Sequence, residues 1–138
     1  MHERRARRIL SAVDGRRPAH AIAAELWPEL PVTHDDRPEH VDRLADKVLA
    51  LRIFPDEAGR MNEPLGDREL LCVSQFTLYG DARKGNRPAY VAAARPEQAE
   101  PLYERFCERT GARRGRFGAH MDVELVNDGP VTLLLELP

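Results

Sequence analysis

The chain has 138 residues, 42% hydrophobic and 32% charged, a composition typical of one folded globular domain and unlike that of a disordered or fibrous protein. Its 21 Lys and Arg against 23 Asp and Glu leave a formal charge of −2, so nucleic acid could be bound only through local basic patches. Two patches occur: Arg83, Lys84 and Arg87 in one loop, and Arg113, Arg114 and Arg116 in another. Charge alone favours solvated surface loops for both.

The cysteine usage and the lack of long apolar runs indicate an intracellular protein. Cys72 and Cys107 lie in apolar segments, where a free cysteine packs as a small hydrophobic residue, and we expect no disulfide and a reducing compartment. The charged start of the chain lacks the apolar run of about 7–15 residues that a secretory signal needs. No stretch approaches the roughly 18 apolar residues of a membrane span. We therefore expect a cytoplasmic protein that does not enter the membrane.

The N-terminal half of the chain contains one clear element and two weaker ones. Residues 9–13 could form a short strand, and residues 19–30 are rich in Ala, Glu and Leu, which favours helix until Pro28 interrupts it. From Pro38 the pattern is clear, because Pro38 and Glu39 suit a first helical turn and apolar residues then recur at helical spacing. We predict a helix over 38–51, followed by a short extended piece at Ile53-Phe54 and a turn.

The C-terminal half alternates strands and one helix. Residues 69–78 (ELLCVSQFTL) are apolar nearly throughout, which is typical of a central strand buried on both faces, and a basic loop follows over 81–95. A second helix is predicted over about 96–109, ending near Gly111. Residues 120–126 and 131–137 are predicted strands, separated by the turn Asn127-Asp128-Gly129-Pro130. The expected fold is a single α+β domain over 1–138, with two main helices covering a mixed or antiparallel sheet.

Several kinds of active site have no support in the sequence. No CxxC or HExxH spacing occurs, and the five histidines do not form a ligand cluster, so we expect no metal. GxGxxG, GxxxxGK[ST] and GxSxG are absent, so neither a nucleotide cofactor nor a serine-hydrolase elbow is indicated. We expect no cofactor.

Two unusual segments remain. Ser74, Gln75 and Thr77 place polar groups in the apolar segment 69–78, where each unpaired buried group costs about 1–3 kcal/mol. Such hydroxyls commonly bond neighbouring carbonyls, and that is the safer interpretation of this segment alone. The other segment, residues 127–132 (NDGPVT), reads by itself as a tight hairpin connection, since Asn, Asp and Gly tolerate positive φ.

Taken together and in order, these segments resemble the D-aminoacyl-tRNA deacylase family (D-tyrosyl-tRNA(Tyr) deacylase). The resemblance rests on SQFTL (74–78) and NDGPVT (127–132), which are the signature pair of the family, at a family-like separation. Similar stretches occur at 44–62, 69–90, 99–106 and 115–137. Residues 32–138 are family-like, whereas residues 1–31 lack the Gln-Arg-Val strand with which family members begin.

The resemblance implies hydrolysis of the ester that joins a D-amino acid to the terminal ribose of tRNA. Backbone amides around Ser74 to Thr77 would stabilise the developing negative charge. Gln75 would position the adenosine end, and Phe76 would pack the strand or contact the adenine. Thr77 would be a positioning group, assisted by the 2′-hydroxyl of the tRNA, because no His or Lys is placed beside it to activate a nucleophile.

The resemblance also implies a homodimer in which the cis Gly129-Pro130 pair reaches the active site of the partner subunit. This pair would leave no room for an L side chain, and glycine-charged tRNA would also be a substrate. Arg83, Lys84 and Arg87 would hold phosphates of the acceptor stem. The alternatives are a non-catalytic module that binds the tRNA end on the same fold and, less favoured, a plain structural domain.

Overall fold

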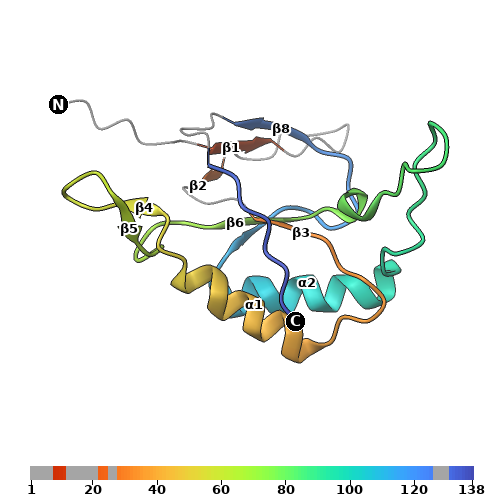
Figure 1. Ribbon diagram of the computed structural model, residues 1–138, viewed down its shortest axis with the longest axis horizontal. Helices are drawn as coiled ribbons and strands as arrows, with labels where there is room; N and C mark the ends of the chain where they lie inside the picture. The colour runs from red at the N-terminus through yellow and green to blue at the C-terminus, as the bar shows by residue number, and fades with distance from the viewer. Residues whose placement is uncertain (1–7, 12–21, 25–27, 126–130) are drawn as a thin grey trace.

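Two α-helices pack side by side against a short parallel sheet, and this layer contains the hydrophobic core (Figure 1). The computed structural model describes residues 8–11, 22–24, 28–125 and 131–138. Helix α1 spans Pro38–Ala50 and α2 spans Pro96–Thr110. The sheet has the order β3 (Glu29–Leu30), β6 (Leu71–Ser74) and β7 (Arg113–Arg114), with both neighbour pairs parallel.

The other described strands form two antiparallel sheets. β1 (Arg8–Ser11) lies between β2 (Ile22–Ala24) and β8 (Asp122–Leu125), and Figure 1 shows this sheet on the side of β6 that is away from the helices. β4 (Phe54–Pro55) and β5 (Met61–Glu63) pair as a hairpin. A 3-10 turn, η1 (Phe76–Tyr79), follows β6 directly. Helices combined with parallel and antiparallel strands confirm the predicted α+β class.

Both helices lie where the apolar periodicity predicts them, over 38–51 and about 96–109. Each begins with a proline in its first turn, where the missing N–H costs no helical hydrogen bond. α2 ends at Gly111, whose φ of 66° is the left-handed conformation that only glycine adopts without strain. Their inward stripes form the helical half of the core: Val41, Ala45 and Val48 from α1, and Ala99, Leu102, Tyr103, Phe106 and Cys107 from α2.

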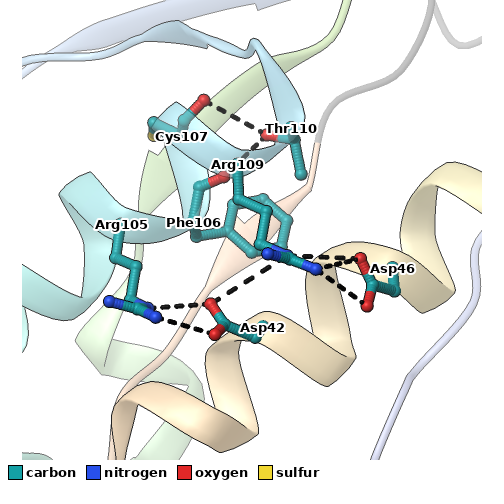
Figure 2. A network of polar contacts seen from close by, with 7 residues as sticks. All are labelled: Asp42, Asp46, Arg105, Phe106, Cys107, Arg109 and Thr110. Atoms are coloured by element: carbon teal, nitrogen blue, oxygen red, sulfur yellow. Dashed lines mark hydrogen bonds and ion pairs between the residues drawn. The ribbon is translucent and has the colours of Figure 1, made fainter.

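Two arginines on α2 join the exposed sides of the helices, as Figure 2 shows. Arg105 donates to both carboxylate oxygens of Asp42 at 2.7 Å, and Arg109 donates to Asp46 at 2.9 and 3.1 Å. The hydrogen bond with Arg105 lowers the pKa of Asp42. Water screens exposed pairs of this kind, so they contribute little to stability, and the core beneath them supplies most of it.

A buried tyrosine connects α2 to the strand that carries the polar segment. The Tyr103 hydroxyl donates to the Cys72 carbonyl at 2.9 Å, and Tyr103 is only 2% exposed. Burial raises the pKa of Tyr103, so the hydroxyl stays protonated and remains a donor. Cys72 and Cys107 are both buried free thiols, as expected of small core residues. The hydrogen bond from Tyr103 therefore anchors β6 at Cys72, two residues before Ser74.

The helix favoured over 19–30 is wrong for the residues of this range that the structure describes, and residues 19–21 and 25–27 lie outside them. Residues 22–24 form β2 and residues 29–30 form β3. Ala23 pairs with Ile9, and Leu30 pairs with Ser74 in the parallel sheet. Helix propensity is a weak preference of a few tenths of a kcal/mol per residue, so strand partners supplied by distant segments override it.

The strand predicted over 131–137 is also wrong, because residues 131–138 have no regular secondary structure. Leu135 packs against the core, but Leu134 is 82% exposed and no ladder of hydrogen bonds runs along the segment within the described residues. An apolar run becomes a strand only where a neighbour supplies backbone partners. In Figure 1 the segment crosses β6 and ends beside α1, where Arg43 donates to the Pro138 carbonyl at 2.5 Å.

Candidate active site

The polar segment of the signature starts at the end of β6 and leaves the sheet. The predicted strand 69–78 is too long, because β6 ends at Ser74 and the chain turns at Gln75 into η1. The last anchor to the sheet is the Gln75 amide, which donates to the Leu30 carbonyl at 3.1 Å. β3, the neighbour on this side, is only two residues long, so no partner strand extends the ladder further. Ser74 and Gln75 are half-buried, and Phe76 and Thr77 are exposed.

The turn leaves two backbone donors at its start. The first hydrogen bond of η1 runs from the Leu78 amide to the Gln75 carbonyl at 3.3 Å, and the Gly80 amide then donates to the Thr77 carbonyl at 2.9 Å. The amides of Phe76 and Thr77 precede these bonds, so the turn gives them no acceptor. Two adjacent amides on an exposed turn have the chemistry needed to bind a developing oxyanion.

The Thr77 hydroxyl is paired with an amide and not with a base. Gln75 Nε2 donates to Thr77 Oγ1, which is the only side-chain hydrogen bond of Thr77 among the described residues. A carboxamide cannot accept a proton from a hydroxyl at neutral pH, so this contact orients Thr77 without activating it. The arrangement supports the prediction that Thr77 is a positioning group.

An aromatic pair stands beside the turn. The rings of Phe76 and Tyr90 lie edge to face, with centroids 5.1 Å apart and planes at 70°. Phe76 is 54% exposed, so part of its ring faces solvent. The sequence motifs indicate no role for Tyr90 or for Gly80, which packs against it. The available signal was an aromatic residue inside the basic loop, three positions after Arg87.

The first part of the basic loop, residues 81–89, carries Arg83, Lys84 and Arg87, lies at the right-hand edge of Figure 1 and is closed by a two-residue bridge. The amides and carbonyls of Asp81 and Ala89 exchange hydrogen bonds of 2.8 and 2.9 Å. Arg83 folds back on Asp81 with N···O distances of 2.8 and 2.6 Å, and these bonds lower the pKa of Asp81. Lys84 and Arg87 make no ion pair with any described residue. Of the three residues predicted to bind phosphate, Arg83 is therefore paired, whereas Lys84 and Arg87 have no acidic partner among the described residues.

A shallow, open depression lies between η1 and this loop. Its lining contains both apolar and charged residues from the two segments: Leu78, Tyr79, Gly80, Asp81, Ala82, Arg83 and Ala92. Because the depression adjoins the segment that carries the two amides, a ligand chain could lie in it while one end reaches η1.

The second basic patch is occupied by ion pairs. Arg113 donates to Glu69 at 2.6 Å, and Arg114 lies 3.5 Å from Glu108. These contacts support the interpretation of this patch as a solvated surface, because its charge is largely compensated.

The predicted chirality-selecting pair, Gly129 and Pro130, lies outside the described residues. Among the residues that are described, no group of three or more His, Cys, Asp or Glu side chains is placed to hold a metal ion. No helix in the described part of the chain is both long and apolar enough to cross a membrane.

Comparisons with known proteins identify the family of this chain. The sequence model of the D-Tyr-tRNA(Tyr) deacylase family matches residues 13–136. The D-aminoacyl-tRNA deacylase of Brevibacillus brevis is 56% identical over 112 residues, which cover 76% of this chain and 77% of the relative. The enzyme of the same name from Cytophaga hutchinsonii is 52% identical over 124 residues, covering 84% of this chain and 83% of the relative.

Solved structures show the same fold. A protein described as the c-Myc DNA Unwinding Element Binding Protein superposes with a TM-score of 0.83 at 35% identity, and 96% of each chain is covered. A probable eukaryotic D-amino acid tRNA deacylase superposes with a TM-score of 0.63 at 17% identity, covering 91% of this chain and 95% of the other, and shows the fold alone. The chain therefore belongs to the D-Tyr-tRNA(Tyr) deacylase family, whose members are hydrolases acting on the ester bond of aminoacyl-tRNA.

Proposed function

We propose that this protein proofreads chirality in the cytoplasm as a single-domain D-aminoacyl-tRNA deacylase, releasing the free D-amino acid and tRNA. Family membership supports the reaction. The observation that carries the assignment to a site is the sharp exit of the chain from β6 into an exposed 3-10 turn, which leaves the Phe76 and Thr77 amides without an acceptor in the turn.

In the proposed mechanism, water attacks the ester carbonyl and loses a proton, and negative charge develops on the carbonyl oxygen. The acyl–oxygen bond to the terminal ribose then breaks, and the ribose oxygen takes up a proton and leaves as the free hydroxyl of the tRNA. The amides of Phe76 and Thr77 would donate to that oxygen, and each donor of this kind is worth about 2.7–4 kcal/mol in the transition state. The 2′-hydroxyl of the tRNA would assist the reaction. Thr77, held by Gln75, would position the substrate, since no described base contacts its hydroxyl.

Selection of the D form is proposed to come from the Gly129-Pro130 turn of a partner subunit in a homodimer. A rigid turn close to the α-carbon would clash with an L side chain, which is specificity by exclusion. Glycine has no side chain to exclude, so glycyl-tRNA(Ala) is proposed as a further substrate.

The acceptor stem is proposed to follow the open depression between η1 and the basic loop. Lys84 and Arg87 would contact its phosphates, because both are exposed and make no ion pair with described residues. Arg83 would contribute less while it remains bound to Asp81.

The test is release of free D-tyrosine from D-Tyr-tRNA by the full chain, measured in parallel with L-Tyr-tRNA, glycyl-tRNA(Ala) and direct tRNA binding. We expect rapid release from the D and glycyl substrates and little release from the L substrate. Binding without release would favour the non-catalytic module. Comparable release from D-Tyr-tRNA and L-Tyr-tRNA would contradict the proposed selection by exclusion.

A further inference from the structure

Tyr90 lies directly after the Asp81–Ala89 bridge of the basic loop, next to the Phe76 ring. The Asp81–Ala89 bridge closes residues 81–89 of the loop one residue before Tyr90, so the position of the Tyr90 backbone is defined. From there the tyrosine ring meets Phe76 edge to face, with centroids 5.1 Å apart. Both rings remain partly open to solvent, at 39% exposure for Tyr90 and 54% for Phe76. Two partly exposed aromatic rings thus form one surface feature.

Gly80 provides the space in which this pair packs. A Cβ atom at Gly80 would lie 3.0 Å from Cε1 of Tyr90 and 2.9 Å from the Thr77 carbonyl oxygen. The φ of Gly80 is −66°, a value open to every residue, so the requirement here is for space and not for an unusual conformation. The turn, the glycine and the bridge therefore all restrict where the Tyr90 ring can stand.

We propose that Tyr90 is a positioning residue of the deacylase: it holds the Phe76 ring so that the open face of Phe76 stacks on an unpaired base of the tRNA end. This inference rests on the proposed function. Stacking on aromatic rings is how proteins hold single-stranded bases, and a ring that is already oriented loses less conformational freedom on binding. Lys84 and Arg87 belong to the loop that the same bridge closes, so phosphate contacts and base stacking share one support.

The experiment measures how much the terminal base contributes to binding. The trinucleotide CCA and the same trinucleotide with an abasic 3′ residue serve as competitive inhibitors of D-Tyr-tRNA hydrolysis. Their inhibition constants are determined for the wild type, Tyr90→Leu and Tyr90→Phe. The ratio of the two constants reports on the base alone, so general damage to the fold or to phosphate contacts cancels. Melting temperatures, kcat and KM are recorded for each variant.

We expect the abasic trinucleotide to bind the wild type about tenfold more weakly than CCA, a typical effect of one stacked base. In Tyr90→Leu the ratio should fall to about two, with KM raised and kcat little changed, because Phe76 is still present but no longer held. Tyr90→Phe keeps the ring and should restore the wild-type ratio.

An unchanged ratio in Tyr90→Leu, whatever happens to its melting temperature, would overturn the proposal and leave a purely structural contact. A wild-type ratio near one would also overturn it, while the hydrolysis itself would stand. If the wild type releases no D-tyrosine, the proposed function fails, and the same ratio is then obtained from direct binding of the two labelled trinucleotides.

Discussion

Replacing Thr77 by alanine separates a nucleophile from a positioning group. Thr77 is exposed, and its hydroxyl accepts a hydrogen bond from the Gln75 side chain. The variant therefore loses one neutral hydrogen bond, worth about 0.5–1.5 kcal/mol. If all of that loss appears in the transition state, hydrolysis slows by about 2- to 13-fold. Loss of a true nucleophile would slow it by about a millionfold.

The assay is single-turnover release of D-tyrosine from D-Tyr-tRNA, with binding measured separately. Thr77→Val keeps the shape of the side chain and removes only the hydroxyl, so it should behave like Thr77→Ala. Thr77→Ser keeps the hydroxyl and should remain close to the wild type. A loss of more than about 10⁴-fold in the Ala and Val variants, with tRNA binding intact, would refute the reasoning and make Thr77 the nucleophile.

The double variant Lys84→Gln/Arg87→Gln should make the negative slope of log K against log[salt] for tRNA binding shallower by about 1.4–1.8, because each phosphate contact contributes about 0.7–0.9. An unchanged slope would show that the phosphates bind elsewhere. Gly80→Ala should lower the free energy of unfolding by about 1–3 kcal/mol, since its Cβ would overlap a backbone carbonyl, and urea titration with no shift in midpoint would contradict the close packing. The stability that Asp42 contributes should be fully present above its ordinary pKa of 3.8 and be lost as the pH falls through its lowered pKa in the folded protein. The urea midpoints of the wild type and Asp42→Asn should therefore converge on acidification. A constant difference between the two midpoints down to pH 3 would argue against the pairing with Arg105.

Elements that depend on local sequence signals are predictable from the sequence, and those that depend on distant segments are not. The helices at 38–51 and 96–109 were predicted well, because the apolar stripe, the first-turn prolines and Gly111 are all local signals. Strand lengths were predicted poorly. Residues 69–78 look like one buried strand, yet β6 ends at Ser74 where its neighbour β3 also ends. No local pattern encodes the length of a partner strand.

Some residues of the candidate site can be predicted from the sequence, and others cannot. The signature segment at 74–77 was found from its residues, since polar groups in an apolar run are visible in the sequence. The roles of Asp81, Gly80 and Tyr90 were not predicted. Asp81 pairs with Arg83, Tyr90 packs against Phe76, and Gly80 leaves the space that the Tyr90 ring needs. These roles depend on how a loop folds back on itself.

By itself, the sequence determined the family, the two helices and the chemistry carried by the polar segment, because each of these depends on residue identity and short-range spacing. Only the tertiary structure decided where the strand ends and the 3-10 turn begins, which amides precede the hydrogen bonds of that turn, and which loop cation pairs with Asp81. Those outcomes depend on contacts between segments far apart in the chain, such as Leu30 with Gln75 and the Asp81–Ala89 bridge. Backbone partners and available space are properties of the assembled fold.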